Sequence, residues 1–283
     1  HRGGPGEPAR VRANGTELEA ELVVAADGIH SPARGALFPG HPGPRYVGFT
    51  TWRLVVPELA RPFTPHETWG RGVLWGTQPL PDGRTYAYAT AAVSPGGSSP
   101  DGELAELLRR FGGWHEPVPA LLAAAAPEDV LRSDAYRMAR ALPAYHRGRV
   151  ALLGDAAHAM PPTLGQGGNQ AVEDAVVLAH HVRNVRHAGS SATALPVALA
   201  AYSAERLPRT MEIVRRASRA ARMNTLTSAP ACALRDASFA ALSGFGPQLA
   251  LRALDGIADW SPPGHPYPAG AGGRSGRTET TPT

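Results

Sequence analysis

Two short apolar segments, far apart in the chain, each end in a paired aspartate and glycine. Residues 22–26 run directly into Asp27-Gly28, and residues 149–153 run into Gly154-Asp155. Apolar runs of this kind are typical of strands buried on both faces of a parallel sheet. Ligands of open α/β sheets bind outside the carboxyl ends of the strands. The pattern predicts an α/β fold with ligand-binding residues there, although Asp27-Gly28 alone is equally typical of an ordinary turn.

Composition places the chain among folded proteins with one large domain or two of ordinary size. It has 283 residues, of which 43% are hydrophobic and 18% charged. The only cysteine, Cys232, excludes an internal disulfide framework and a multi-cysteine metal site, so no metal is expected. No apolar run is long enough for a membrane-spanning helix, so no membrane partner is expected. The segment behind His1 is polar and unlike a signal peptide, so we expect a cytoplasmic protein with an upstream part missing from this sequence.

The basic charge has a compositional explanation. The net charge is +4, but all 28 basic residues are arginine and lysine is absent. This bias, with abundant alanine, glycine and proline, indicates GC-rich coding rather than a basic patch, and no nucleic-acid partner is expected. The absence of lysine also excludes a phosphate-binding P-loop and Schiff-base chemistry from this chain.

Local signals predict a hairpin, an antiparallel sheet and several helices. Asn14-Gly15 is typical of a tight hairpin turn, and Asp101 is expected to be the N-cap of a helix. The turn at residues 81–83 joins two strands of the sheet. Further strands are expected at residues 46–56, 72–79 and 84–93, and helices at 103–111, 120–126, 170–186 and 197–223.

The segment after Gly154-Asp155 is suited to a flat or anionic ligand. Small residues follow Asp155, prolines stiffen the next stretch, and glycines of the 165–169 segment expose backbone N–H groups before a long helix. The positive end of the helix dipole favours a phosphate or a developing negative charge at this place.

Two motifs in this order resemble those of the group A FAD-dependent monooxygenases, the aromatic hydroxylases. The segment 154–162, Gly-Asp-Ala-Ala-His-Ala-Met-Pro-Pro, is similar to their Gly-Asp motif, and the segment 27–34, Asp-Gly-Ile-His-Ser-Pro-Ala-Arg, is similar to their Asp-Gly motif. The resemblance covers residues 10–225, because segment 46–53 resembles the start of their substrate-domain sheet and segment 202–209 their following helix.

The resemblance implies roles for particular residues. Asp155 would bind ribityl or ribose hydroxyls of FAD, and Asp27 and Arg34 would serve its pyrophosphate region and the passage of NADH or NADPH. Pro162 would lie along the isoalloxazine, and the helix start would stabilise negative charge on the reduced flavin. The implied cofactor-binding set is Asp27, Gly28, Arg34, Gly154, Asp155, Pro162, Gly165, Gln166, Gly167, Gly168 and Asn169.

The resemblance also implies a division of the chain. The expected fold is mixed α/β: a partial three-layer Rossmann-like FAD domain with an inserted antiparallel substrate sheet and C-terminal helices. The corresponding segments are residues 1–38 and 148–225 for the FAD domain, 39–147 for the substrate sheet, 226–261 for a helical region and 262–283 for a disordered tail. The family's Gly-x-Gly-x-x-Gly unit is absent, so the chain corresponds to the C-terminal two-thirds of such an enzyme.

Two further residues, Arg53 and His158, can each be interpreted in two ways. Arg53 follows Trp52 on a strand that, by resemblance, lines the substrate cavity, so it is a candidate catalytic residue beside Pro162; the alternative is an ordinary ion pair at a sheet edge. His158 lies within the Gly-Asp motif, where packing and hydrogen bonding are favoured over a role as a base.

The function implied is hydroxylation of an aromatic or similarly activated small molecule, using NAD(P)H and O2, through a flavin C4a-hydroperoxide. The alternatives are a related flavin enzyme (a halogenase or a reductase) and a non-catalytic flavoprotein fragment. Residues 51–57, Thr-Trp-Arg-Leu-Val-Val-Pro, do not match the Trp-x-Trp-x-Ile-Pro of tryptophan-type halogenases. The sequence leaves open the substrate, its regiochemistry, the choice between NADH and NADPH, and the oligomeric state.

Overall fold

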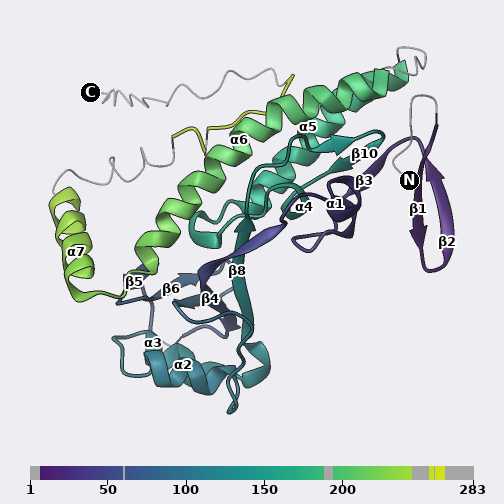
Figure 1. Cartoon of the computed structure of the whole chain (residues 1–283). Coiled ribbons are helices and arrows are strands. Elements are labelled where there is room, and N and C mark those ends of the chain that lie inside the picture. The colour runs from purple at the N-terminus through teal and green to yellow at the C-terminus, as the bar shows by residue number, and fades with distance from the viewer. Residues whose placement is uncertain (1–6, 60, 188–193, 244–254, 258, 265–283) are drawn as a thin grey trace, which may run out of the picture.

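The computed structural model describes residues 7–59, 61–187, 194–243, 255–257 and 259–264. Figure 1 shows two lobes joined by strands β4 and β8 and by the long helix α6. The first lobe has a three-stranded sheet in the order β3-β10-β9, and the second has a five-stranded antiparallel sheet in the order β5-β6-β7-β4-β8. The fold is therefore mixed α/β, as the sequence predicts.

The sheet of the first lobe brings the two apolar segments together. Its strands are β3 (Val23–Ala25), β9 (His146–Arg147) and β10 (Val150–Leu152). Strands β3 and β10 pair in parallel, with Val23 opposite Val150. Burial on both faces is confirmed for β10, but it is wrong for β3, whose Val24 is 46% exposed. Among the described residues β3 pairs only with β10, so it forms an edge of this sheet.

Helices surround this small sheet and contribute to the first lobe's core. They are α1 (Pro32–Leu37), α4 (Asp155–His158), α5 (Gly167–His187) and α6 (Ala194–Asn224). Their core packs against β10 and includes Val177, Leu199 and Tyr202. The Tyr202 hydroxyl donates to the Leu152 carbonyl at 2.9 Å and so fastens α6 to β10.

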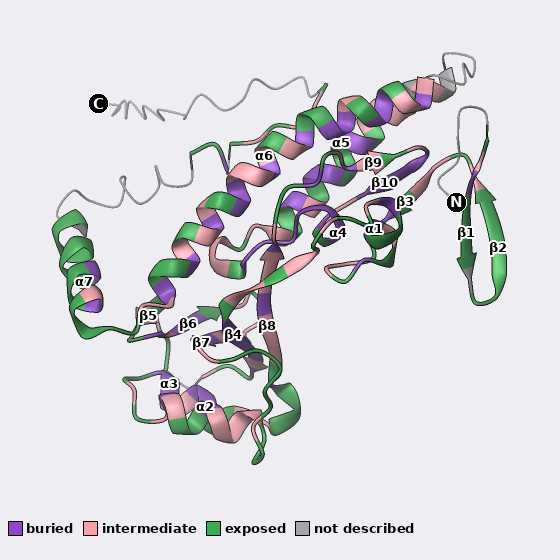
Figure 2. Cartoon of the chain, viewed as in Figure 1, coloured by how far each residue is buried: buried purple, intermediate pink, exposed green. Residues whose placement is uncertain are grey.

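The predicted hairpin is confirmed. Strands β1 (Ala9–Ala13) and β2 (Thr16–Ala20) pair antiparallel along their whole length. Asn14 and Gly15 both have positive φ angles, 50° and 78°, as the tight turn requires. The hairpin projects from the first lobe, and Figure 2 shows it as largely exposed.

The second lobe is built on the five-stranded sheet. Its strands are β4 (Pro44–Val56), β5 (His66–Trp69), β6 (Val73–Pro79), β7 (Thr85–Ala91) and β8 (Leu131–Met138). The three predicted strands correspond to β4, β6 and β7, whereas β5 and β8 were not expected. Gly83, in the predicted turn between β6 and β7, has a φ of 85°.

One face of this sheet is covered by two helices, α2 (Glu103–Phe111) and α3 (Val118–Ala124). Trp52 and Leu54 of β4 are buried there with Phe111 of α2. The bounds of α2 are as predicted, and α3 lies two residues earlier than expected. The predicted N-cap is wrong: Gly102 is the cap residue, and the Asp101 carboxylate instead accepts a hydrogen bond from Arg109 at 3.1 Å.

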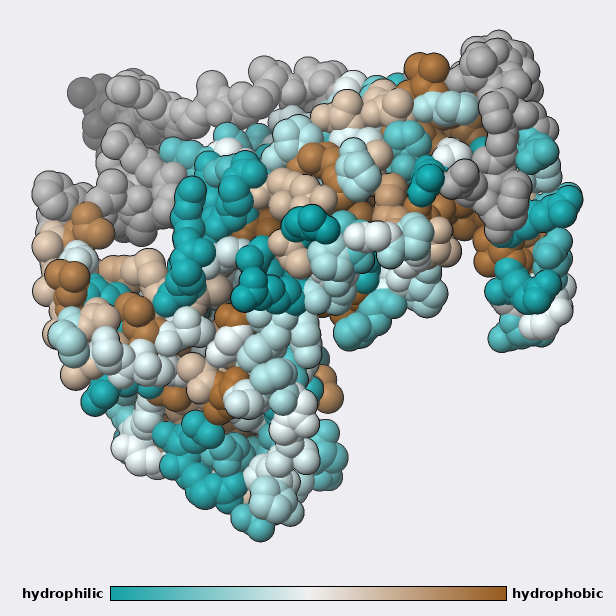
Figure 3. Space-filling model, viewed as in Figure 1, coloured by the Kyte–Doolittle hydropathy of each residue, from teal (hydrophilic) through white to brown (hydrophobic). Residues whose placement is uncertain are grey.

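The remaining described elements are two short 3-10 helices, η1 (Pro127–Asp129) and η2 (Pro162–Leu164), and helix α7 (Ala229–Ser243). Helix α7 packs at the β5 edge, where Phe239 contacts the Trp69 ring. Its surface carries the exposed side chains of Leu234 and Leu242. Figure 3 shows brown, hydrophobic patches in the region of α7. None of the described helices is long and apolar enough to cross a membrane. Residues 265–283 of the expected tail lie outside the described residues.

Candidate cofactor site

The Asp-Gly turn follows β3 directly and forms the start of α1. The backbone N–H of Ala33 donates to the Asp27 carboxylate at 3.0 Å, and that of Arg34 donates to the Ser31 hydroxyl at 2.8 Å. Gly28 has a φ of 79°, a conformation that favours glycine. Asp27 is exposed, so its carboxylate faces solvent while one oxygen holds the helix start.

Arg34 connects the Asp-Gly turn with the Gly-Asp turn. Its side chain is buried and donates to the carbonyls of Ile29 at 2.7 Å and of Ala156 at 3.1 Å. Burial lowers the pKa of the guanidinium, and the neighbouring Asp27 carboxylate opposes that change. These bonds join two segments that are distant in sequence, so Arg34 fixes the relative position of both motifs.

The Gly-Asp turn lies between β10 and α4. Gly154 has a φ of 61°, and a Cβ built there would be 3.0 Å from the Cβ of Ala171, so the turn packs directly on α5. The neighbouring Asp155 is exposed. Within the described ranges no group donates a hydrogen bond to its carboxylate. Asp155 therefore offers both carboxylate oxygens to a ligand at the carboxyl end of β10.

The glycine-rich segment continues from the Gly-Asp turn into α5. Pro162 begins η2, and Gly165, which ends it, has the left-handed φ of 63°. The Thr163 hydroxyl donates to the Ala217 carbonyl at 2.7 Å, which ties this segment to α6. Each of the predicted residues in this segment is exposed or partly exposed: Pro162, Gly165, Gln166, Gly167, Gly168 and Asn169. The first-turn N–H groups of α5 thus stand next to the Gly-Asp turn.

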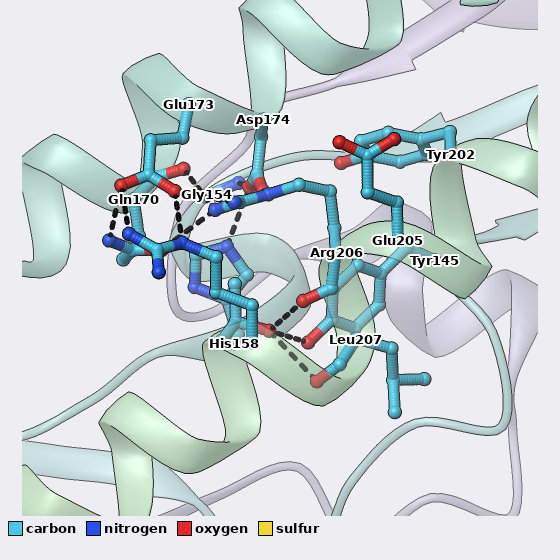
Figure 4. A network of polar contacts seen from close by, with 12 residues as sticks. Tyr145, Gly154, His158, Gln170, Glu173, Asp174, Tyr202, Glu205, Arg206 and Leu207 are labelled. Atoms are coloured by element: carbon cyan, nitrogen blue, oxygen red, sulfur yellow. Dashed lines mark hydrogen bonds and ion pairs between the residues drawn. The ribbon is translucent and has the colours of Figure 1, made fainter. Parts of the chain in front are cut away.

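Beneath these turns lies a buried network of charged groups (Figure 4). Arg206 of α6 is 0% exposed and donates to Asp174 at 2.7 Å and to Glu173 at 2.5 Å, both on α5. It also donates to the side chain and backbone carbonyls of Gln170, at 2.7 and 3.2 Å. Arg209 donates twice more to Glu173, at 2.7 and 2.8 Å. The network joins α5 and α6 through buried, fully paired charges.

Asp174 carries this network to the Gly-Asp turn. One of its carboxylate oxygens accepts the Gly154 N–H at 2.9 Å and lies 2.6 Å from Nε2 of His158. Burial alone would raise the pKa of Asp174, but the hydrogen bond and charge of His158 and those of Arg206 lower it. The placement of His158, fully buried between Asp174 and the Tyr145 ring, favours packing over a role as a base.

Sequence reasoning missed the network, although it contained a signal. Glu173 and Asp174 are adjacent carboxylates within an otherwise apolar helix pattern, and such groups are buried only when they are paired. Arg206 falls within segment 202–209, which resembles a helix of the family, but the sequence assigns it no partner. The partner is 32 residues away in sequence and becomes evident only when α5 and α6 pack together.

Arg53 lies apart from the two motifs, on β4 of the second lobe. Its side chain is exposed and donates to the Ser133 hydroxyl at 2.9 Å. No carboxylate of the described residues forms an ion pair with it, so the expected alternative of an edge ion pair is not what the structure shows. Its hydrogen bonds do not reach the Asp-Gly or Gly-Asp turn.

Comparison with known proteins decides the family. Residues 3–217 match the family model described as FAD binding domain. The chain belongs to the FAD binding domain family. Its relatives are group A flavin monooxygenases, FAD is the family's cofactor, and the family uses NAD(P)H.

Individual relatives support the assignment to the FAD binding domain family. The chain is 40% identical over 226 residues to the aurachin C monooxygenase/isomerase of Stigmatella aurantiaca, covering 79% of this chain and 57% of that protein. It is 38% identical to the 3-amino-4-hydroxybenzoate 2-monooxygenase of Streptomyces cremeus, covering 79% and 55%. It is also similar to the crystal structure of Klebsiella pneumoniae HpxO complexed with FAD and uric acid, with a TM-score of 0.69, 31% identity and coverage of 78% and 56%. The chain thus spans about half the length of the curated relatives it matches.

Proposed function

We propose that the chain is part of an FAD-dependent monooxygenase that uses NADH or NADPH and O2 to hydroxylate an aromatic or similarly activated small molecule. The observation that carries the proposal is the Gly-Asp turn beside the N-terminus of α5, where the exposed carboxylate of Asp155 has no hydrogen-bond donor among the described residues. The match to the FAD binding domain family over residues 3–217 supports it. So do the relatives, which are monooxygenases.

The residues of the first lobe fit FAD. Asp155 would accept hydrogen bonds from ribityl or ribose hydroxyls, and Gly154, which has no side chain, lets the turn that carries Asp155 pack directly on α5. Asp27, Gly28 and Arg34 would serve the pyrophosphate region, with the buried Arg34 holding the Asp-Gly turn against the Gly-Asp turn through its bonds to Ile29 and Ala156. Bound here, FAD would supply electron transfer from NAD(P)H and the activation of O2.

The glycine-rich segment would act on the flavin ring. Its residues Gln166, Gly167, Gly168 and Asn169 present backbone N–H groups at the positive end of the α5 dipole, whereas Gly165 shapes the turn and donates its own N–H to the Pro162 carbonyl at 2.9 Å. Such groups stabilise negative charge that develops on a ring edge. Pro162, stiff and exposed at the start of η2, would lie along the ring and help to exclude water.

The second lobe would hold the substrate. Arg53 is exposed on β4 without a carboxylate partner among the described residues, so its charge is free to orient an acidic group of the substrate. We assign it this orienting role. Two alternatives stay open to test, namely a related flavin enzyme such as a halogenase or reductase, and a flavoprotein fragment without activity.

Titration of the full chain with FAD tests the cofactor site. Asp155→Ala should weaken FAD binding about 10- to 100-fold, because a hydrogen bond to a charged group is worth about 1.5–3 kcal/mol. Glu128→Ala is the matched control, since Glu128 is an exposed carboxylate in the other lobe. Equal FAD affinity in both variants would contradict the role of Asp155.

A second measurement separates the alternatives. NADH and NADPH oxidation is followed with candidate aromatic substrates, and the product is identified by mass. A product heavier by one oxygen atom supports the proposal, whereas a halogenated or reduced product indicates a related flavin enzyme. Flavin binding without any NAD(P)H oxidation would favour the non-catalytic fragment.

A further inference from the structure

A cavity of about 510 Å³ lies where the chain passes from the first lobe to the second and back. Its lining residues come from two segments, 38–41 between α1 and β4, and 140–147, which follows β8 and ends in β9. The volume falls within the range of small-molecule sites, about 300–1,000 Å³. Neither the residues assigned to the cofactor site nor Arg53 line this lobe-junction cavity, so it is separate from both.

Hydrogen bonds connect the two segments that form the cavity. The Ala139 N–H donates to the Gly43 carbonyl at 3.1 Å. The Gly43 N–H donates to Nδ1 of His41 at 3.0 Å, so the ring carries its proton on Nε2, which donates to the Arg140 carbonyl at 3.1 Å. The His41 ring thus holds the two walls at a fixed separation.

Two arginines bring positive charge to the lobe-junction cavity. Arg147 donates to the Leu37 carbonyl at the end of α1, where the helix dipole favours a cation. Arg140 is exposed, and in the described part of the chain its guanidinium has neither a hydrogen-bond nor an ion-pair partner. No carboxylate is among the described residues that line the cavity. Both guanidinium groups therefore keep donors for an acidic group of a ligand.

The rest of the lining is mainly apolar. Phe38, Pro39, Ala141 and Pro143 contribute to it. Small-molecule sites typically combine apolar walls with a few polar groups that fix the orientation of the ligand. The rings of phenylalanine and proline present flat apolar faces, which suit a flat apolar group. The lining therefore fits a compound with an acidic end and a flat apolar body.

We propose that the lobe-junction cavity is a second binding site, for a small organic anion with a carboxylate or a phosphate group on a flat apolar body. The acidic group binds Arg140 and Arg147, and the apolar body rests against Phe38 and Pro143. Because the ligand contacts both connections between the lobes in the folded chain only, its binding raises the unfolding temperature. The site goes beyond the proposed function, since binding here requires neither FAD nor turnover.

Calorimetric titration of the full chain, with and without added FAD, tests this proposal. The probes are benzoate and phenyl phosphate, and benzyl alcohol is the uncharged control of similar size. Each acid should bind about tenfold more tightly than the alcohol, because its charged group accepts hydrogen bonds from guanidinium donors. The titrations are repeated in Arg53→Met, which lacks the arginine proposed to orient the substrate, and the preference for the acids should be retained.

Further variants locate the binding. Arg140→Met/Arg147→Met should abolish the preference for the acids and leave binding of the alcohol unchanged. Arg12→Met/Arg222→Met is the matched control, because it removes the same net charge from exposed arginines outside the cavity, and it should keep the preference. Ala141→Phe retains both arginines of the cavity but fills the space beside them, so it should weaken binding of all three probes about tenfold.

Every outcome of these titrations bears on the site. Equal binding of acids and alcohol, no binding of any probe, or the same loss in both double variants would overturn the proposal. A preference that disappears in Arg53→Met would also overturn it, because the acid would then bind in the second lobe. A preference that depends on Arg140 and Arg147 supports the site, and the tighter of the two acids decides between a carboxylate and a phosphate ligand. Thermal melts accompany each variant, and Ala141→Phe, at an exposed position, keeps the test valid if the double variant does not fold.

Discussion

Two arginines, one in each lobe, have opposite surroundings. Arg206 is fully buried between α5 and α6, and each of its side-chain nitrogens donates to an acidic or carbonyl oxygen. Arg53 is exposed on the sheet and donates only to a hydroxyl in the described part of the chain. A buried charge must be matched by the protein itself, whereas an exposed charge without a partner is free for a ligand. The comparison separates an arginine that stabilises the fold from one that is available for binding.

Replacing each of the two arginines by methionine tests this comparison, and the larger loss of stability is expected at Arg206. Arg206→Met should destabilise the protein by about 3–5 kcal/mol, because it removes the one arginine that pairs with both buried carboxylates, Glu173 and Asp174. Urea unfolding followed by circular dichroism measures the change. A loss below about 1 kcal/mol would show that the carboxylates find other partners, and that the network is not what holds α5 to α6.

The pH dependence of the unfolding free energy tests how the network of Arg206, Glu173 and Asp174 stabilises the protein. Against the opposing effect of burial, contacts with Arg209 and Arg206 lower the pKa of Glu173, and contacts with His158 and Arg206 lower the pKa of Asp174. Groups with a lowered pKa contribute stability above their ordinary pKa values, here 4.5 and 3.8, and lose it as the pH falls toward the lowered values. Unfolding free energy should therefore fall steeply below about pH 4.

Asp174→Asn provides the comparison for acid stability. The variant should be less stable than wild type at pH 7, and its stability should change less between pH 4 and lower pH, because one titrating group is gone. Urea unfolding of wild type and of Asp174→Asn across this pH range measures the difference. Parallel pH curves for wild type and variant would mean that Asp174 does not contribute to the acid transition.

Gly154→Ala tests how tightly the Gly-Asp turn packs. The change places a side chain at a φ of 61°, and its Cβ would be 3.0 Å from that of Ala171. We expect a loss of about 1–3 kcal/mol. Gly165→Ala is the matched control, since its φ is 63° but no atom lies within 4 Å of the new Cβ. Equal losses would assign the whole effect to the backbone and none to packing on α5.

The smallest effect is expected at the exposed arginine. Arg53→Met should change the free energy of unfolding by no more than about 0.5 kcal/mol, because the side chain is exposed and has no charged partner among the described residues. The same urea experiment as for Arg206→Met measures it. A loss as large as that of Arg206→Met would make Arg53 a structural residue and remove the distinction between the two lobes.

Local patterns in the sequence predicted much of the fold. The hairpin turn, the bounds of α2 and the paired apolar strands were visible because each depends on residues near one another in sequence. Strand β8 was missed because Arg132, Asp134 and Arg137 interrupt its apolar pattern. Arg132 is paired with Asp134, and the further partners of this pair come from other elements: Thr50 of β4, Glu103 of α2 and the backbone N–H of Gly96.

The candidate site, too, was predictable only where it depends on residues near one another in sequence. The turns that carry Asp27 and Asp155 were predicted because glycine beside aspartate at a strand end is a local signal. The bridge from Arg34 to Ala156 and the network of Arg206 were not, because each joins residues from different elements. Asp101 is a further example, because its carboxylate accepts a hydrogen bond from Arg109 instead of capping α2.

The pairing of β3 with β10 has a consequence for how the chain folds. The first lobe is assembled from two segments separated by the entire second sheet, and the bond from Arg34 to Ala156 spans 122 positions. Contacts between such distant residues form late, because the intervening loop must first be closed at an entropic cost. The second sheet, whose β6 and β7 are linked by a short turn, can form before that closure and shorten the distance to be closed. Pulse-labelled hydrogen exchange should therefore show protection in β6 and β7 before β3 and β10, so that the candidate cofactor site is assembled after the second sheet.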